Sequence, residues 1–394
     1  MRRIFKYIVV YFCAFTGPLA GNAILSMLKE LQLSYNVELN DVLLSIPTFM
    51  FPFAIFQLFS GTISERWSRR TLIFVGLLIY GLSSIGIALA DDFFLFLLMR
   101  IGQGVGYAFV GPVTVAVLGD IADRSKYGIL MGFYGSAVTA GLSIGPLIGG
   151  YTAMYDWRIA FWIFGLISFL AAILVLAVIP RIDQVEKRSN ERMVENIREV
   201  VRNRNLSLIS LIGALAFFAM IGNLSFLSDS LRYAPFDYSS SEVGLLLTVA
   251  GLVGIFVSPI AGAFIDRFST RLSTMIGLSI AAPMIALLAL SDDYFVFMAL
   301  LAAIGAAGTF IWAGLLTISI EELPALRGTS SSVFNSSRFS GYAIAPTLLA
   351  PVYAAFNFDG IAISCMVIAI AALILSRCLS GKACFHRRAI ISKD

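Results

Sequence analysis

The second half of this chain repeats the first, and this repeat restricts the fold more than any other feature. Residues 61–70 read Gly-Thr-Ile-Ser-Glu-Arg-Trp-Ser-Arg-Arg, and residues 262–271, 201 positions later, read Gly-Ala-Phe-Ile-Asp-Arg-Phe-Ser-Thr-Arg. The same offset relates the two aspartates at 91–92 to those at 292–293. A repeat of this kind predicts that both halves contain the same elements in the same order.

The composition places these elements in a membrane. The chain has 394 residues, of which 59% are hydrophobic and 13% are charged, whereas a soluble domain is about 25% charged. Because a helix needs about 20 apolar residues to cross a bilayer, twelve spans are predicted, roughly at 7–28, 42–63, 71–90, 93–117, 128–152, 157–179, 206–228, 242–265, 272–290, 293–318, 328–355 and 359–378. The expected fold class is an all-α membrane protein with two pseudo-symmetric six-helix bundles.

Basic residues are concentrated on one set of connections between the spans. Of 28 lysines and arginines, 23 lie in the termini, the central polar stretch and alternate loops, while the opposite loops hold only Lys29, Arg158 and Arg232. The positive-inside rule therefore predicts that both termini are cytoplasmic, in a multi-pass protein of the cell membrane. The first apolar segment resembles a signal peptide, but its cleavage would leave eleven spans, so we interpret it as a transmembrane helix.

One long polar stretch separates the two halves. Its apolar residues Val194, Ile197 and Val200 recur at helical spacing, which favours an amphipathic helix on the membrane surface. The predicted organisation is an N-terminal six-helix bundle at 1–180, a cytoplasmic linker helix at 181–205 and a C-terminal bundle with a short tail at 206–394.

The sequence predicts neither a metal site nor a nucleotide-binding loop. The only histidine, His386, lies in the tail, and the cysteines Cys13, Cys365, Cys378 and Cys384 lie in spans or in that tail, so no metal site and no disulfide are expected. Glycines at 102–106 lie inside an apolar span and not after a strand, which argues against a phosphate-binding loop. We expect no cofactor, no nucleic acid partner and a monomer.

Three motifs resemble those of the major facilitator superfamily. They are the loop at 61–70, in which Glu65 and Ser68 replace the usual aspartate and glycine, the fourth-span motif Arg100-x-x-Gln103-Gly104-x-Gly106, and the fifth-span motif Gly141-x-x-x-Gly145-Pro146-x-x-Gly149-Gly150. The third is typical of the antiporter branch. The resemblance covers the whole chain and implies a secondary transporter with one central site that opens alternately to the two sides, similar to the twelve-span drug/proton antiporters.

The first motif is predicted to form a gate. A carboxylate among arginines at a helix end can pair with an arginine or with the positive end of a neighbouring helix, and the resemblance assigns a conformational latch to this loop. Positive-inside topology alone would also explain the arginines, but it explains the recurring acid–arginine pair less well. The predicted gate residues are Gly61, Glu65, Arg66, Arg69, Arg70, Asp266 and Arg267.

The third motif predicts close helix packing. Gly141, Gly145 and Gly149 share one helix face, where small residues let two backbones approach in lipid. Pro146 removes a backbone donor and is expected to kink the helix. Together with Gly150, these residues form either a hinge between moving bundles or a tightly packed contact without motion.

Arg100 is the most informative single residue. A guanidinium inside a span costs at least about 2.5–3.5 kcal/mol, so a functional role is the default hypothesis. The alternative is an arginine that is bonded to backbone carbonyls. Gln103 lies one turn away, and Arg338, in the eleventh span, raises the same question.

Carboxylates are scarce inside the spans. Asp229, near the external end of the seventh span, is the deepest, and burial would raise its pKa enough to carry a proton. A solvated acid beside Arg232 is the alternative. Further candidates are Glu30, Asp41, Asp120 and Asp123. Proton coupling is implied by the family resemblance and not by the positions of these carboxylates.

The resemblance also implies that helices one, four, seven and ten line the central cavity. Amides and aromatic rings in these spans suit an amphipathic organic molecule, although single rings also pack between helices or face lipid. With the groups above, the predicted substrate and coupling residues are Arg100, Gln103, Asn22, Asn223, Asp229, Tyr107, Phe226, Phe310, Trp312 and Arg338.

The predicted function is export of small amphipathic or apolar organic compounds by alternating access with proton antiport. The first alternative is transport of an organic anion or metabolite through Arg100 and Arg338. A non-transporting membrane receptor is a more distant alternative. No cluster of His, Asp and Glu occurs within the spans, so an enzyme is not expected.

Overall fold

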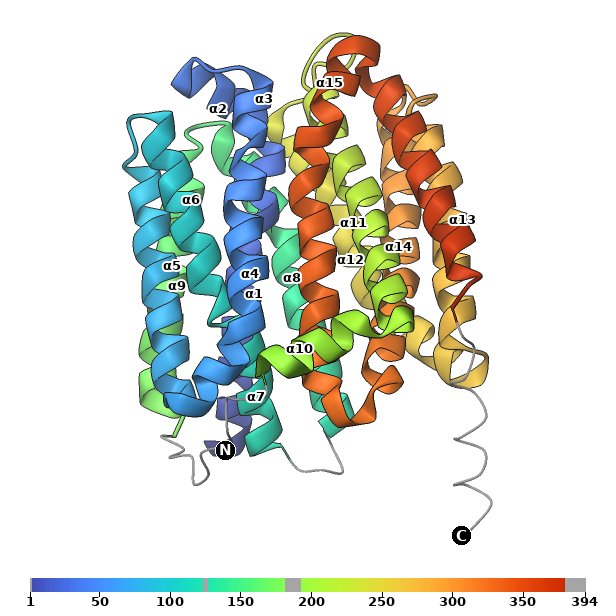
Figure 1. The fold of residues 1–394 in the computed structure, drawn as a ribbon. Coiled ribbons are helices and arrows are strands. Elements are labelled where there is room, and N and C mark those ends of the chain that lie inside the picture. Colours follow the sequence, from blue (N-terminus) through green and yellow to red (C-terminus); the bar gives the residue numbers. More distant parts are fainter. Residues whose placement is uncertain (1, 123–126, 181–192, 380–394) are drawn as a thin grey trace. The chain divides into compact units, whose positions relative to one another are not determined.

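A computed structural model describes residues 2–122, 127–180 and 193–379 (Figure 1). Eleven stretches of these described residues are helical, long and apolar enough to cross a membrane. The last stretch, Pro324–Ser376, contains Asn357, whose backbone is not helical (φ 53°, ψ −155°), so it holds two spans and the total becomes twelve. The predicted all-α membrane fold is confirmed.

The helices group into two compact units. The first unit comprises 1–190 and 227–251, and the second comprises 191–226 and 252–394. Residues 227–251 belong to the second half by the sequence repeat but to the first unit by their contacts. The domain boundaries proposed from the sequence therefore stay a prediction.

The first unit is built around contacts between helices distant in sequence. α1 packs along α8 and α9, α5 packs against α6 and α9, and α4 packs against α6 (Figure 1). Large rings such as Tyr80, Phe96 and Phe161 are fully buried among them. Its helices are α1 (Arg2–Ala23), α2 (Leu28–Tyr35), α3 (Leu39–Leu43), α4 (Ser45–Arg66), α5 (Arg69–Ala88), α6 (Phe93–Ala108), α7 (Gly111–Ile121), α8 (Tyr127–Ala153) and α9 (Arg158–Val178).

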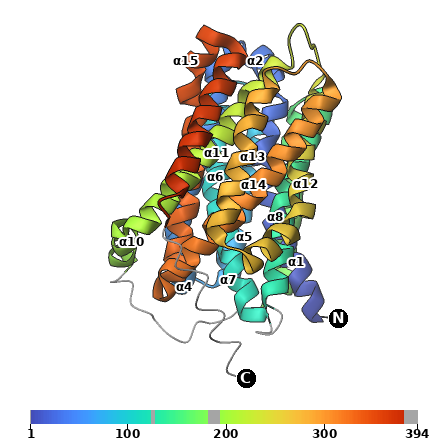
Figure 2. The ribbon, with the colours of Figure 1, turned by 90° about the vertical axis from the view of Figure 1, so that its right-hand side faces the viewer.

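The second unit has one continuous hydrophobic core. α13 and α14 run side by side, and α15 packs against both (Figure 2). Ile209, Ile311 and Phe334 lie at the centre of this core. Its helices are α10 (Met193–Arg202), α13 (Thr270–Leu288), α14 (Tyr294–Glu322) and α15 (Arg327–Ser376), while α11 (Arg204–Ser230) and α12 (Ser240–Arg267) each contribute residues to both units.

The sequence repeat places an aspartate N-cap at the start of both α6 and α14. Asp92 accepts a hydrogen bond from the Leu95 N–H at 2.9 Å and caps α6. Asp293 accepts from the N–H groups of Phe295 and Val296 and caps α14. The repeated aspartates therefore satisfy backbone donors that the first turn of a helix leaves unpaired.

The fourth predicted span is divided into α6 and α7, which are separated at 109–110. Pro112, in the first turn of α7, has no N–H to donate to a preceding turn, so the helix restarts there. Before this break, a Cβ atom on Gly104 would lie 2.2 Å from the Phe49 carbonyl oxygen. The glycine motif thus serves close approach of α6 to α4.

The fifth-span glycines pack against α1. A Cβ atom on Gly141, Gly145 or Gly149 would lie 2.3, 2.2 or 2.7 Å from a backbone carbonyl oxygen of α1. Gly341 repeats this contact against the Ala214 carbonyl at 2.1 Å, now between α15 and α11. The predicted tight packing is present in each unit, whereas the hinge role stays a prediction.

The other two residues of this motif face a different helix. A Cβ atom on Gly150 would lie 2.2 Å from the Ser240 carbonyl oxygen at the start of α12, and the Pro146 carbonyl oxygen lies close to Gly244. α8 continues as a helix across Pro146.

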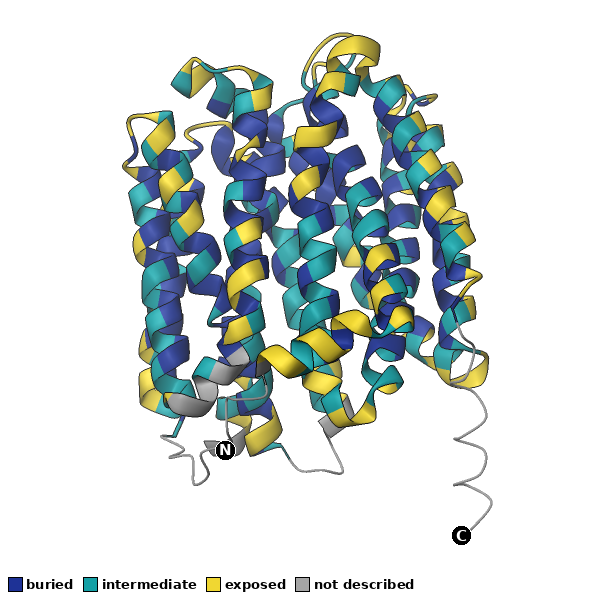
Figure 3. Ribbon diagram, viewed as in Figure 1, coloured by how far each residue is buried: buried dark blue, intermediate teal, exposed yellow. Residues whose placement is uncertain are grey.

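The described part of the polar stretch between the halves is α10, which is largely exposed (Figure 3). Val200 is buried in the second unit, whereas Val194 and Val201 are exposed. Residues 181–192 of the proposed linker lie outside the described residues.

Two glycines of α8 provide a matched test of the close packing against α1. Gly145→Ala is expected to lower the melting temperature in detergent, because the new methyl group has no room and overpacking costs about 1–3 kcal/mol. Gly132→Ala should leave it unchanged or raise it, because nothing lies within 4 Å of that position and alanine favours a helix by about 1 kcal/mol. Equal shifts for the two variants would contradict the assigned contact.

Candidate functional site

The structure places Arg100 in the interior of the first unit, with 0% of its surface exposed. Its Nε donates to the Ser45 carbonyl at 3.1 Å, and its Nη1 donates to the Ala20 carbonyl at 3.1 Å and to Gln103 Oε1 at 2.8 Å. The guanidinium also lies over the Phe49 ring, 4.6 Å from its centroid. Arg100 therefore connects α6 to α1 and to the beginning of α4, as the alternative interpretation anticipated.

The same network continues toward α5. Gln103 Nε2 donates to Ser84 Oγ at 2.8 Å, and this hydroxyl donates to the Tyr80 carbonyl. The Tyr80 hydroxyl in turn donates to the carbonyls of Thr16 and Gly17 in α1. Arg100 and Gln103 thus connect helices of the first unit, and their role in substrate binding or coupling stays a prediction.

A second group of charged residues joins α2 to the end of α11. Arg232 forms a short ion pair with Glu30, and its Nη1 donates to the Tyr238 carbonyl. Lys29 donates to the Arg232 carbonyl at 2.8 Å and lies over the Tyr233 ring, 4.3 Å from its centroid. We call Lys29, Glu30, Gln32, Asp229 and Arg232 the α2–α11 cluster.

Asp229 is part of this cluster. It is 4% exposed and accepts a hydrogen bond from Gln32 Nε2 at 3.2 Å. The side chain is therefore buried and not a solvated acid. Arg232, its neighbour in sequence, pairs with Glu30.

Among the remaining predicted site residues, the two matching amides differ. Asn22 donates to the Leu142 carbonyl at 3.4 Å, whereas the amide of Asn223 is buried and has no hydrogen-bond partner among the described residues. Tyr107 is buried against Phe53, with ring centroids 4.8 Å apart.

Two further predicted aromatic residues pack inside the second unit. Phe226 is fully buried, and its ring lies 4.8 Å from that of Tyr353. Phe310 contacts the ring of Phe264 edge-on at 5.7 Å. Neither contact suggests direct access for a ligand.

Arg338 has different surroundings from Arg100. Its guanidinium lies over three aromatic rings, 4.7 Å from Phe217, 5.4 Å from Trp312 and 4.4 Å from Phe339. The indole Nε1 of Trp312 has no hydrogen-bond partner among the described residues. Because a guanidinium and an indole N–H only donate hydrogen bonds, the aromatic cage suits an acceptor that carries an apolar body.

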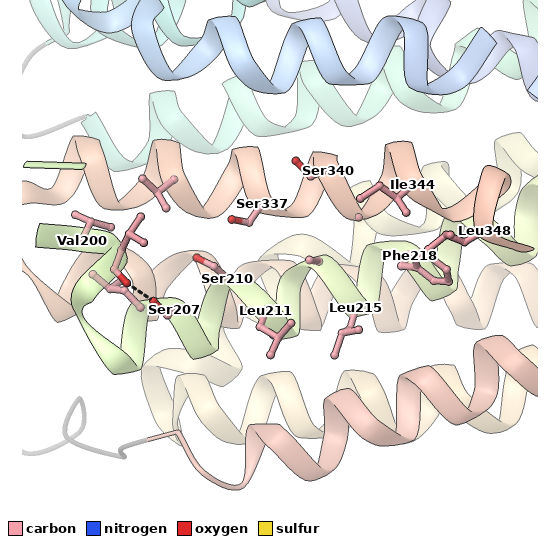
Figure 4. Close-up of a pocket in the computed structure, with 15 residues that line it drawn as sticks. Val200, Ser207, Ser210, Leu211, Leu215, Phe218, Ser337, Ser340, Ile344 and Leu348 are labelled. Atoms are coloured by element: carbon pink, nitrogen blue, oxygen red, sulfur yellow. Dashed lines mark hydrogen bonds between the residues drawn. The ribbon is translucent and has the colours of Figure 1, made fainter. Parts of the chain in front are cut away.

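A pocket of about 560 Å³ opens in the second unit between α10, α11 and α15 (Figure 4). Its walls are mainly apolar, and its polar groups are serine hydroxyls from α11 and α15. The lining residues are Val200, Val201, Leu206, Ser207, Ser210, Leu211, Ala214, Leu215, Phe218, Val333, Ser337, Ser340, Gly341, Ile344 and Leu348. Sequence reasoning missed this site, because its serines carry no motif.

The predicted gate residues are only partly described. The surroundings of Gly61 and the side chains of Glu65 and Arg66 lie outside what the structure describes. Arg69 pairs with Asp120 at the end of α7 and donates to the Ala116 carbonyl at 2.8 Å. This partner, Asp120, appeared in the sequence only as a candidate proton site.

Two further gate arginines, Arg70 and Arg267, have other contacts. Arg70 donates to the Leu176 carbonyl in α9, and Arg267 lies over the Phe268 ring, 5.6 Å from its centroid. Asp266 precedes Arg267 in the last turn of α12. The gate role of these residues stays a prediction.

A duplicated half and buried charged groups among membrane-spanning helices are features typical of secondary transporters. The model of one family, the Major Facilitator Superfamily, matches residues 10–346 and again 206–383. The chain belongs to this superfamily, whose members are transporters and not enzymes. The cell membrane, the cytoplasmic termini and the monomeric state stay predictions.

Several relatives bear names that indicate transport. An uncharacterized MFS-type transporter of Bacillus subtilis, YceJ, is 25% identical over 358 residues, which is 90% of each chain. Multidrug resistance protein 2 of the same organism is 26% identical over 216 residues, 52% of this chain and 54% of that protein. The MFS antiporter QDR3 of Candida albicans is 26% identical over 189 residues, 46% of this chain and 27% of that protein.

The fold has a solved counterpart. The crystal structure of a bacterial homolog of the human lysosomal transporter Spinster, in an inward-facing and occupied conformation, is similar with a TM-score of 0.74. It covers 96% of both chains at 18% identity, so the likeness shows the fold alone.

The Arg100 network yields a direct prediction. Arg100→Gln should lower the melting temperature strongly, because each buried acceptor that loses its donor costs about 1–3 kcal/mol. Arg158→Gln is the control, since its side chain is 30% exposed and lies 3.5 Å from the Ala90 carbonyl. Thermal unfolding in detergent measures both. An Arg100→Gln protein of unchanged stability that no longer transports would instead assign Arg100 to the transport cycle.

Proposed function

We propose that this transporter exports small amphipathic organic compounds in exchange for protons. The observation that carries the proposal is the pocket between α11 and α15 (Figure 4). Its volume of about 560 Å³ falls within the range of about 300–1,000 Å³ that is usual for small-molecule sites. Apolar walls with a few hydroxyls suit a ligand that is mostly hydrocarbon and makes few hydrogen bonds.

Exchange with protons is supported by chemistry and by resemblance. Asp229 is buried and Glu30 is 17% exposed with a buried Oε2, and carboxyl groups in such surroundings can bind and release protons during transport. The fifth-span motif is typical of antiporters, and relatives named for multidrug resistance and antiport are 26% identical to this chain over the residues that align. The predicted direction is outward.

A second candidate function is the transport of organic anions. The aromatic cage around Arg338 favours it, because guanidinium groups match the geometry of carboxylates and the surrounding rings suit an apolar body. Arg100 supports this candidate less directly than Arg338, since it is buried and bonded within the first unit. A receptor that binds without transport would show ligand binding but no movement across a bilayer.

Filling the pocket tests the main proposal. Ala214→Trp, and independently Ser340→Phe, should reduce efflux of an amphipathic dye from proteoliposomes under an imposed pH gradient about tenfold, equivalent to about 1.4 kcal/mol of lost binding. Val367→Trp is the control, because Val367 is 55% exposed on α15 and lies outside the pocket lining. Unchanged efflux in both pocket variants would remove the pocket from the transport cycle. Wild-type efflux that ignores the gradient would reject proton exchange.

The second candidate predicts a change of substrate preference. Arg338→Gln should reduce transport of an aromatic carboxylate relative to the matching aromatic alcohol by about tenfold or more, because a hydrogen bond to a charged group contributes about 1.5–3 kcal/mol. Arg271→Gln removes a charge that is bonded to the Arg377 carbonyl instead, and should leave the ratio unchanged. Competition between the two labelled compounds measures the ratio. A ratio that Arg338→Gln does not change would contradict recognition of anions by the cage.

A further inference from the structure

We propose that Glu30 is the proton-binding residue that couples protonation to the closing of the α2–α11 cluster. This inference rests on the proposed proton exchange and assigns it to one carboxyl group. The cluster joins α2, which lies at the end of the first unit opposite the N-terminus (Figure 1), to residues 229–232, which form the C-terminal end of α11 and the two residues after it.

The ion pair of Glu30 is enclosed but incomplete. The side chains of Glu30 and Arg232 are only 17% and 13% exposed. Oε1 of Glu30 meets Arg232 Nη2, whereas Oε2 is buried and has no hydrogen-bond partner among the described residues. A buried carboxylate oxygen without a donor is costly, and a proton on the carboxyl group removes most of that cost.

Charges of both signs surround this carboxyl group. The cations favour its ionised form, and the acids oppose it. The groups that face Glu30 or its partner from α2, from the end of α11 and from α12 are Lys29, Asp229, Arg232, Tyr233 and Glu242. Asp229 and Glu242 add negative charge beside the two cations. Arg232 also donates a hydrogen bond to the Tyr238 carbonyl, so Glu30 is not its only partner.

Burial raises the pKa of Glu30 above its ordinary value, although Arg232 and Lys29 act in the opposite direction. When the cluster separates and Glu30 meets water, the pKa returns toward about 4.3. The closed cluster therefore binds the proton more tightly than the open one. By linkage, acid favours the closed cluster, and this advantage is lost as the pH rises through the raised pKa.

An ordinary stabilising ion pair would behave in the opposite way. It would lower the pKa of the carboxyl group, and acid would then open the contact. The direction of the pH effect consequently separates a proton-binding site from a structural salt bridge.

The location of the cluster gives this equilibrium a role in transport. The segment 227–251, which the cluster helps to hold, packs on the first unit, although the sequence repeat places it in the second half. Further contacts of this segment are the hydrogen bond from Thr248 to the Ser143 carbonyl at 2.9 Å and the close approach of Gly150 to Ser240. The cluster lies on the side of the membrane that is predicted to be external. A proton from outside would therefore promote closing of the cluster, and an exporter must close on this side after it releases its substrate.

Dipolar EPR can test the proposal without measuring transport. Spin labels at Leu33→Cys and Ala234→Cys, both exposed positions, would be introduced into the full-length protein without its four native cysteines. The close-coupled population should grow as the pH falls from about 8 to about 5, by up to about tenfold in the population ratio for each pKa unit separating the open and closed states. Glu30→Gln should abolish the pH dependence, and Glu30→Asp should restore part of it.

Asp237→Asn is the matched control. Asp237 is an exposed acid in the same loop, and its left-handed backbone (φ 48°) accepts asparagine, so the pH dependence should persist in this variant. The proposal is overturned if Glu30→Gln keeps the wild-type pH dependence, or if acid opens the cluster. Failure of proton exchange itself would appear separately, as wild-type efflux from proteoliposomes that does not respond to a pH gradient.

Discussion

A bilayer core supplies no hydrogen-bond partners, and this constraint determines how polar side chains are placed inside the spans. Arg100 meets it by donating to carbonyls of two other helices, and Ser168 and Thr248 meet it by donating to the carbonyls of Leu77 and Ser143. These three side chains therefore join neighbouring helices, whereas others, such as Thr309 and Thr317, donate to a carbonyl of their own helix. Buried atoms without such a partner among the described residues include the Asn223 amide and the Trp312 indole N–H.

Much of the architecture was predictable because the chain uses one half twice. The apolar blocks predicted the spans, and the repeated aspartates that begin the fourth and tenth spans are helix caps in both units. The glycine face at Gly141 and Gly145 predicted a close helix contact, which the structure shows against α1. These signals are local, since they depend on spacing within one helix.

The candidate site was less predictable because its contacts are not local and do not follow the repeat. Glu30 and Arg232 are 202 positions apart, and the repeat pairs position 30 with Leu231 instead. Arg69 meets Asp120 from another helix, and a span alone does not reveal which carbonyls receive Arg100. Burial inside a span marked Arg100 as exceptional, but only its bonding partners show that it organises the first unit.

The non-helical residue Asn357 has a consequence for how the chain enters the membrane. A single residue with a left-handed φ of 53° interrupts α15, with helix on both sides of it. Because only one residue separates the two helices, the connection is too short for one span to insert into the membrane before the other. The last two spans are therefore expected to leave the insertion machinery as one unit, and Asn357 offers little room for an inserted tag or domain.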